Sequence, residues 1–483
     1  MGILSGLEPG PVWTWFERIC AIPHGSRHTD RLRSLLAEAA RGWGLETILD
    51  DAGNLVIRKD GTLGLENAEP VILQGHLDMV CEKEAGCPLD FSQEGLRLRV
   101  ADGFVSAQGT TLGGDDGIAV AYCMALLEDG EIPHPPLEVV LTTDEEIGML
   151  GAAALDLSLL RGRRLVNLDS EEEGVFLAGC AGGVTVKCVL PVRRVAAPGT
   201  FLRIRIGGLT GGHSGTEIHR SRANGDHLLG RLLYKTRKES DFRLVWVRGG
   251  SKDNAIPRAA EAVLASASPE NAEAVQRTVE KWGAVLKREY RDTDPGFSIT
   301  VEDTKAPDLP PMDRDSTCRT ITALFALPNG VLRMNRCLPE MVETSLNLGI
   351  VDTAESTVSL SFLVRSGVES EKQAVADRLA CLTEALGGSV TYSGDYPGWA
   401  YRTDSPLRER FVQTFARLYG HRPEIRSIHA GLECGIFAGG LDGLDVLSLG
   451  PEILDIHTPS ERMNVDSVRR TWELLLAALA SME

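Results

Sequence analysis

Residues 71–80 read VILQGHLDMV, an apolar, β-rich run that ends in a histidine and an aspartate. Three more short apolar runs also end in polar clusters: 137–142 before TDEEIG, 165–168 before DSEEEG, and 446–449 before GPEILDIHTPSER. Continuous apolar runs of this length are typical of strands that are buried in a parallel sheet. Because open α/β sheets bind ligands beyond the carboxyl ends of their strands, the four clusters are predicted to converge on one site.

The pattern of apolar and polar residues changes along the chain. Residues from about 10 to 180 alternate between apolar runs and amphipathic stretches, which predicts an α/β domain whose mixed, mostly parallel sheet is flanked by helices. Residues 183–394 instead combine alternating strands, long polar helices and proline-rich connections. We therefore expect a catalytic domain formed by residues 1–182 and 395–483, with an inserted α+β lid domain at 183–394.

The insert contains a faint internal duplication. Residues 261–282 and 358–382 each indicate a strand, a turn and an amphipathic helix. Two similar βαβ-like halves are the prediction, and chance similarity is the alternative.

Composition excludes several classes of protein. At 483 residues the chain is long enough for two domains, and its 68 acidic against 50 basic residues give a net charge of −18. Such a charge argues against nucleic acid or an anionic membrane as the main partner. No basic leader precedes an apolar run, so a cytoplasmic location is expected. The ten cysteines form no CxxC pair, and Cys180 is interpreted as a packing residue rather than a nucleophile.

The clusters carry an unusual number of carboxylates. Asp115 lies in the glycine-flanked turn TTLGGDDG (110–117), ahead of an apolar helix, and Glu146 and Asp169 follow two of the strands. Gathering these groups at one sheet edge would be repulsive unless cations lay among them. Two divalent ions carry four positive charges, which three carboxylates and one hydroxide would balance. The imidazoles of His76 and His457 suit zinc, cobalt or manganese better than magnesium or calcium.

Five of these segments resemble a known family. GHLDMV, TTLGGDDG, TTDEEIGM, NLDSEEEG and IHTPSERM occur in the order and spacing of the M20 clan of co-catalytic metallopeptidases. NLDSEEEG, GCAGG and HAGLECG resemble in particular its aminoacyl-histidine (Xaa-His) dipeptidase, carnosinase-like subgroup. The resemblance covers nearly the whole chain.

The resemblance implies a role for each matched residue. One metal ion would be held by His76 and Asp169, the other by Glu146 and His457, and Asp115 would bridge them, followed by a cis peptide bond. Glu145 would be the general base, and Asp78 would orient His76. Asp116 departs from the asparagine common at its position. In the insert, His213, Asn254 and Arg365 match positions that bind the substrate.

The implied function is a two-metal hydrolase that cleaves dipeptides of the Xaa-His type with broad specificity, using zinc, or else cobalt or manganese. An aminoacylase, a deacylase or another exopeptidase of the clan is an alternative, because these enzymes share the amide bond. An inactive metal-binding scaffold is an alternative of another class. The duplicated lid is expected either to replace a partner subunit's lid or to form a homodimer interface, and a homodimer is the favoured expectation.

Overall fold

The four apolar runs form the middle of one sheet. In the computed structural model, which describes residues 2–196 and 199–482, they are strands β3 (Val71–His76), β6 (Leu137–Thr142), β7 (Arg164–Asn167) and β21 (Asp445–Ser448). They are neighbours in the order β6-β3-β7-β21, and every adjacent pair is parallel. The predicted parallel centre of the sheet is confirmed, so the carboxyl ends of all four strands lie at one edge.

Antiparallel strands complete this sheet on both sides. The full order is β1-β2-β6-β3-β7-β21-β8-β20, with β1 (Glu46–Leu49), β2 (Leu55–Lys59), β8 (Val175–Cys180) and β20 (Glu424–Ile428). The β1/β2, β2/β6 and β21/β8 pairs are antiparallel. The sheet is therefore mixed, as predicted, and its parallel part is confined to the strands that carry the polar clusters.

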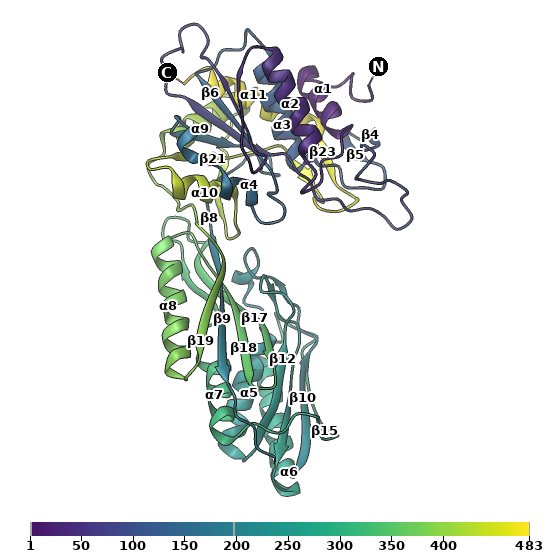
Figure 1. Ribbon diagram of the computed structural model, residues 1–483, viewed down its shortest axis with the longest axis vertical. Coiled ribbons are helices and arrows are strands. Elements are labelled where there is room, and N and C mark those ends of the chain that lie inside the picture. The colour runs from purple at the N-terminus through teal and green to yellow at the C-terminus, as the bar shows by residue number, and fades with distance from the viewer. Residues whose placement is uncertain (1, 197–198, 483) are drawn as a thin grey trace. The chain divides into compact units, whose positions relative to one another are not determined.

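Helices cover this sheet and supply its core (Figure 1). The helices are α1 (Gly10–Cys20), α2 (Asp30–Gly42), α3 (Gly114–Glu128), α4 (Leu150–Ala154), α9 (Pro406–Tyr419), α10 (Glu433–Gly440) and α11 (Val465–Leu479). Helix α3 contacts α1 and β3 and is buried along the whole of its apolar run. Helix α11 begins after Asn464, which caps it: the Asn464 side chain accepts from the Ser467 N–H. Strands β4 (Leu98–Ala101), β5 (Phe104–Ala107), β22 (Ile453–Leu454) and β23 (Arg462–Asn464) form a smaller sheet.

A second sheet has nine strands, in the order β15-β10-β14-β12-β17-β18-β9-β19 with β16 beside β17. Its strands are β9 (Gly182–Pro191), β10 (Thr200–Gly207), β12 (Arg243–Gly249), β14 (Ala260–Ser266), β15 (Ser298–Thr304), β16 (Gly330–Met334), β17 (Val342–Thr353), β18 (Thr357–Ser366) and β19 (Ser389–Tyr396). Its helices are α5 (Gly225–Glu239), α6 (Pro269–Glu289), α7 (Arg314–Ala326) and α8 (Glu369–Ala385). Strands β11 (Gly212–His213) and β13 (Ala255–Ile256) form a separate pair.

Eight of the nine strands form two copies of one motif, and β16 belongs to neither copy. In chain order the first copy is β10-α5-β12-β14-α6-β15 and the second is β9-α7-β17-β18-α8-β19. Each copy places its fourth strand beside its first, then its third and its second, which is the split β-α-β order of ferredoxin-like domains. The predicted strand-turn-helix segments are β14-α6 and β18-α8, one in each copy. The first copy is inserted between β9 and α7 of the second, and β12 pairs with β17 where the copies meet.

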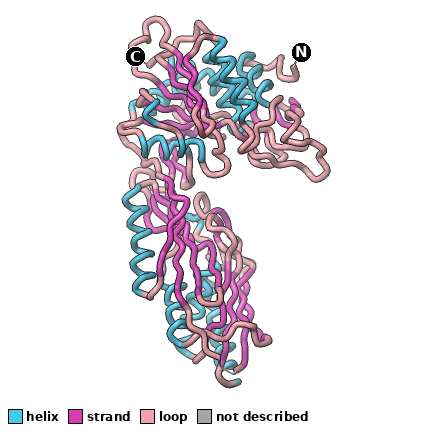
Figure 2. The backbone as a smooth tube through the Cα atoms, in the orientation of Figure 1, coloured by secondary structure: helices cyan, strands magenta, loops and turns pink. Residues whose placement is uncertain are grey.

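Side-chain alternation assigns the two faces of this sheet. Along β18, Val358, Leu360, Phe362 and Val364 pack in the core with residues of α5 to α8, so all four helices cover that face. Arg365 occupies an alternate position and therefore belongs to the face without helices. Figure 2 sets these strands, in magenta, against the cyan helices.

The chain separates into two units. The first contains residues up to Gly179, Tyr401–Ser427 and the residues from Leu432 onward, and the second contains Cys180–Ala400 and Ile428–Gly431. The expected insert, 183–394, falls inside the second unit, and its function as a lid stays a prediction. In the parts of the chain that the structure describes, no helix combines the length and the hydropathy needed to span a membrane.

Candidate metal centre

His76 ends strand β3 with its ring held in one orientation. Its Nδ1 donates to the carbonyl oxygen of Asp78 at 2.9 Å, which directs Nε2 toward the neighbouring carboxylates. That Nε2 lies 3.0 Å from Asp115 Oδ1 and 3.4 Å from Asp169 Oδ1. A neutral imidazole whose other nitrogen is bonded in this way is the usual state of a metal-binding histidine.

A second imidazole faces the other side of Asp115. His457 Nε2 lies 3.2 Å from Asp115 Oδ2 and 3.1 Å from Glu146 Oε1. Asp115 thus directs one carboxylate oxygen to His76 and the other to His457. This is the arrangement that a carboxylate needs to bridge two cations.

The turn that carries Asp115 has the expected cis peptide bond, between Asp115 and Asp116. The two side chains diverge: Asp116 Oδ2 accepts the His76 backbone N–H at 3.0 Å. A Cβ on Gly75 would lie 2.5 Å from that same oxygen and 2.7 Å from the Ala119 Cβ. Only glycine therefore fits between strand β3 and the start of helix α3.

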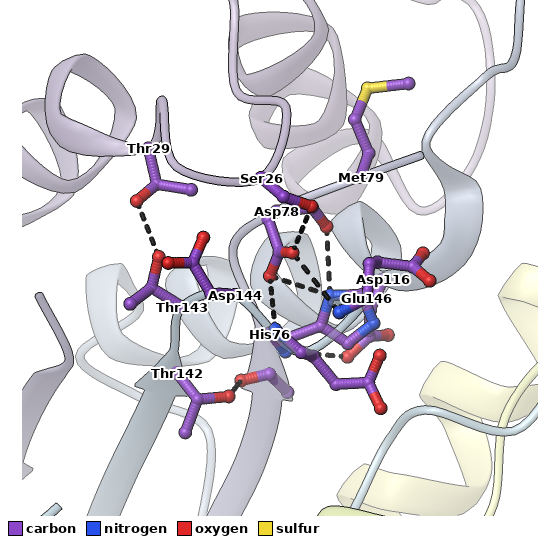
Figure 3. A network of polar contacts seen from close by, with 12 residues as sticks. Ser26, Thr29, His76, Asp78, Met79, Asp116, Thr142, Thr143, Asp144 and Glu146 are labelled. Carbon is purple, nitrogen blue, oxygen red and sulfur yellow. Dashed lines mark hydrogen bonds and ion pairs between the residues drawn. The ribbon is translucent and has the colours of Figure 1, made fainter. Parts of the chain in front are cut away.

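The carboxylate of Asp78 holds the acidic loop after strand β6. It accepts from Ser26 Oγ at 2.8 Å and from the backbone N–H of Glu146 at 3.3 Å (Figure 3). It also accepts from the backbone N–H of Glu145 at 3.0 Å. Its Oδ1 lies 3.6 Å from His76 Nδ1, whose hydrogen bond goes instead to the Asp78 carbonyl. Asp78 therefore bonds His76 through its backbone carbonyl, while its carboxylate lies beside that ring and fixes the backbone of Glu145 and Glu146.

The protein alone leaves this centre electrostatically unbalanced. Burial raises the pKa of Glu145 to about 8, and the carboxylates of Asp169, Glu146 and Asp115 add to this rise while His76 opposes it. Burial likewise raises the pKa of Asp169 to about 8, against the opposing effect of His76. Hydrogen bonds to Asp115 and Glu146 raise the pKa of His457 to about 10. Cations among these groups would relieve the repulsion.

The donor atoms are close enough to share cations. Ligand atoms of His76, Asp115 and Glu146 all lie within 4.8 Å of one another, and so do those of His76, Asp116 and Asp169. Together with His457, these groups supply the imidazole nitrogens and carboxylate oxygens that zinc, cobalt and manganese accept. The residues therefore fit a pair of divalent ions.

Two buried glutamates at this centre are not indicated by the sequence patterns. Glu461 accepts the backbone N–H groups of Leu112, Gly113 and Gly114 at 2.8, 3.2 and 2.8 Å, just before Asp115. Glu433 accepts from Gln74 Nε2 at 2.5 Å and from Thr142 Oγ1 at 2.6 Å, beneath the ends of β3 and β6. Both stand in quoted motifs, IHTPSERM and HAGLECG, but only the fold shows what they hold.

The three substrate-binding candidates lie in the second unit. Strands β11 and β13 pair His213 with Ala255, and the Ser214 N–H donates to the Asn254 carbonyl at 2.9 Å, so His213 and Asn254 are neighbours. Burial lowers the pKa of His213, and the positive charge of Arg365 lowers it further. The three residues therefore belong to one cluster of this unit.

Arg365 lies in a row that crosses four strands. The register aligns Tyr396, Gly183, Arg365 and Ser345. Arg365 donates from Nη1 to the Tyr396 hydroxyl at 2.9 Å, and Ser345 Oγ lies 2.7 Å from His429 Nε2. Arg365 is only 5% exposed, its Nε has no partner, and among residues 2–196 and 199–482 no carboxylate lies within ion-pair distance of it. A buried guanidinium without an acid partner suits an incoming carboxylate.

Cys180 does not take part in either cluster through an exposed thiol. It ends strand β8 with 1% exposure, and its backbone bonds to that of Trp399. Its burial agrees with the packing role expected from the sequence.

Comparisons with known proteins extend over the whole chain. The model of peptidase family M20/M25/M40 matches residues 72–481. The chain is 39% identical over 481 residues to the cytosol non-specific dipeptidase of Escherichia coli (strain K12), covering 99% of each. The crystal structure of aminoacylhistidine dipeptidase from Vibrio alginolyticus superposes with a TM-score of 0.94 at 39% identity, covering 100% of this chain and 98% of that one. Aminopeptidase PepT from Bacillus cereus, at 16% identity and a TM-score of 0.57 with 98% of both chains covered, shares the fold.

Proposed function

Because the chain belongs to peptidase family M20/M25/M40, we propose that it is a metallo-dipeptidase whose centre is built around Asp115. The observation that carries the proposal is the placement of the Asp115 carboxylate between two imidazoles, with one oxygen toward His76 and the other toward His457. Full-length similarity to two proteins named as dipeptidases supports the reaction class.

In this proposal the ten candidate residues have different tasks. His76 and Asp169 would hold one ion, Glu146 and His457 would hold the other, and Asp115 would be a ligand of both. The ions, zinc by preference or else cobalt or manganese, supply Lewis acidity that lowers the pKa of water and polarises the scissile carbonyl. Asp78 fixes the backbone of the Glu145 loop, as its hydrogen bonds indicate.

Glu145 is the general base of the proposal. Its carboxylate takes the proton of the attacking water and delivers it to the leaving amine, so that one group acts as base and then as acid. Burial raises the pKa of this carboxyl group, which suits a group that must hold a proton between the two steps. The Asp78 carboxylate holds the backbone N–H of Glu145, which limits movement of the base.

Arg365, with His213 and Asn254, binds the free carboxylate of the substrate. The support is that Arg365 is buried, oriented by Tyr396 and without an acid partner in the described parts of the chain. A site that needs a free amine as well as this terminal carboxylate would act as a dipeptidase, because N-acyl amino acids carry the carboxylate but lack the amine. Xaa-His dipeptides with broader tolerance are the proposed substrates, by likeness to the aminoacylhistidine and non-specific dipeptidases. A cytoplasmic location and a homodimer complete the proposal.

The test combines metal analysis with a substrate panel. Purified protein should contain about two transition-metal ions per chain and should hydrolyse carnosine and other dipeptides with His, Leu or Gly in second position. N-acyl amino acids should be poor substrates. Metal binding without hydrolysis of any dipeptide would favour the inactive scaffold, and preferential cleavage of N-acyl amino acids would favour an aminoacylase.

A further inference from the structure

A cavity of about 720 Å³ lies beside the metal centre, within the first unit. Four short segments line it, at residues 25–28, 79–83, 88–92 and 146–147. Glu146 belongs both to this lining and to the metal centre, and Ser26, another lining residue, bonds the Asp78 carboxylate. Ser26, Met79 and Glu146 appear together with His76 in Figure 3. A molecule bound at the metal centre therefore has direct access to this cavity.

One wall of the cavity is apolar. Met79 and Leu89 are buried, Val80 and Phe91 are half-buried, and Ile147 is 41% exposed. Ile147 directly follows Glu145 and Glu146 on the acidic loop, so a large apolar side chain faces solvent within two residues of the proposed base. Apolar side chains left uncovered in a concave site are typical of a ligand-binding surface.

The wall is preformed by bonds within its own loop. Lys83 Nζ donates to the Leu89 carbonyl at 2.8 Å, and Asp90 Oδ1 accepts from the Ser92 hydroxyl and N–H at 2.7 and 2.9 Å. Glu84 and Gly109 are joined by a backbone hydrogen bond of 2.9 Å. The cavity therefore does not depend on a ligand to keep its shape.

The charges of the lining indicate which end of a dipeptide it receives. Its one lysine already bonds a carbonyl, and no arginine is found among the described residues that line it. Asp90 offsets the charge of this lysine, and Glu146 is assigned to a metal ion, so the described lining residues offer a substrate carboxylate no unpaired lysine or arginine. The candidate carboxylate-binding residues Arg365, His213 and Asn254 all belong to the other unit.

We propose that this cavity binds the side chain of the N-terminal residue of the dipeptide and makes the enzyme favour large apolar residues at that position over glycine. The inference rests on the proposed dipeptidase function and deepens it. A cavity of this volume falls in the range of about 300–1,000 Å³ that is usual for small-molecule sites, so it holds branched, aromatic and imidazole side chains. The volume of the cavity then accounts for a broad specificity, and its apolar wall accounts for the preference for large apolar N-terminal residues.

The experiment compares three dipeptides: Leu-Gly, Gly-Gly and Gly-Leu. In Ile147→Ser and in Phe91→Ala, the ratio of kcat/KM for Leu-Gly to that for Gly-Gly should fall about tenfold, the effect of removing apolar contacts from a specificity pocket. The ratio is taken within one preparation, so a loss of folded protein cancels. Leu150→Ser is the matched control, because Leu150 is 49% exposed three residues beyond Ile147 and does not line the cavity, and its ratio should equal that of the wild type.

Two results would overturn the inference. One is an unchanged ratio in both variants, and the other is a loss that falls on Gly-Leu rather than on Leu-Gly, which would assign the cavity to the C-terminal residue. Either result would leave the dipeptidase function intact. A wild-type protein that cleaves none of the three would instead refute the function itself.

Discussion

Replacement of Glu461 should destabilise the turn that carries the bridging carboxylate. Its carboxylate accepts three buried backbone N–H groups, two at Oε2 from Leu112 and Gly113 and one at Oε1 from Gly114. Gly114 begins helix α3, whose positive end also favours a negative charge there. Each buried N–H left without an acceptor costs about 1–3 kcal/mol.

The two variants should differ by the number of acceptors that they lose. Glu461→Gln keeps one oxygen for the two N–H groups at Oε2 and turns its amide toward Gly114, so it should lose about 1–3 kcal/mol of unfolding free energy. Glu461→Leu keeps no acceptor and should lose about 3 kcal/mol or more. Because Asp115 is the next residue, both variants should also bind zinc more weakly, in the same order.

Urea unfolding of metal-free protein, followed by tryptophan fluorescence, measures the first effect, and calorimetric titration with zinc measures the second. Glu131→Gln is the control, since Glu131 is exposed and follows the opposite end of helix α3 from this turn. If Glu461→Leu unfolded within 0.5 kcal/mol of the wild type, or bound zinc as tightly, the hydrogen bonds to Glu461 would not support the site as argued.

Three further variants test other parts of the structure. Glu145→Gln should keep both metal ions, by elemental analysis, and lower kcat about 10²–10⁴-fold, since it removes the base alone; unchanged turnover would reassign that role. Tyr396→Phe removes the hydroxyl that orients Arg365 and should raise KM about tenfold for dipeptides with a free carboxylate while kcat changes little; an equal fall in kcat would contradict a binding role. Burial raises the pKa of Asp226 well above its usual value, and within the described residues neither carboxylate oxygen has a partner. Wild-type stability should therefore be greatest below pH 4 as far as this group is concerned and should decline as pH rises toward the raised pKa. Asp226→Asn should flatten that decline in unfolding measured from about pH 5 to 9, and an identical slope in both proteins would contradict it.

The sheet centre and the convergence of the site were predictable from the sequence for a specific reason. Strands β3, β6, β7 and β21 are buried on both faces and so read as continuous apolar runs, and the polar residues directly after them can only lie at one edge of a parallel sheet. The antiparallel strands on either side give no such signal, because their partners depend on long-range register.

Contacts that join distant backbone groups were beyond sequence reasoning. Glu461 meets Gly114 across 347 positions, and its side chain recognises N–H groups that every residue except proline carries, so no residue pattern indicates the pairing. The same holds for Asp78, whose carboxylate lies 3.6 Å from His76 Nδ1 and also accepts the N–H groups of the Glu145 loop, which no residue pattern indicates. The row that joins Tyr396 to Arg365 depends on a register shift between Ser393 and Tyr396 that alternation alone would misplace.

Because one copy of the motif is inserted into the other, the strands of this unit can pair only in a certain order during translation. All strands of the inner copy, β10 to β15, have been synthesised once residue 304 is made, so it can pair its strands early. Strand β9 emerges before any of them, yet its two neighbours, β18 and β19, end only at residues 366 and 396. Strand β9 therefore stays without its full set of partners while roughly two hundred further residues are translated. During that time its unpaired edges can bind chaperones or aggregate.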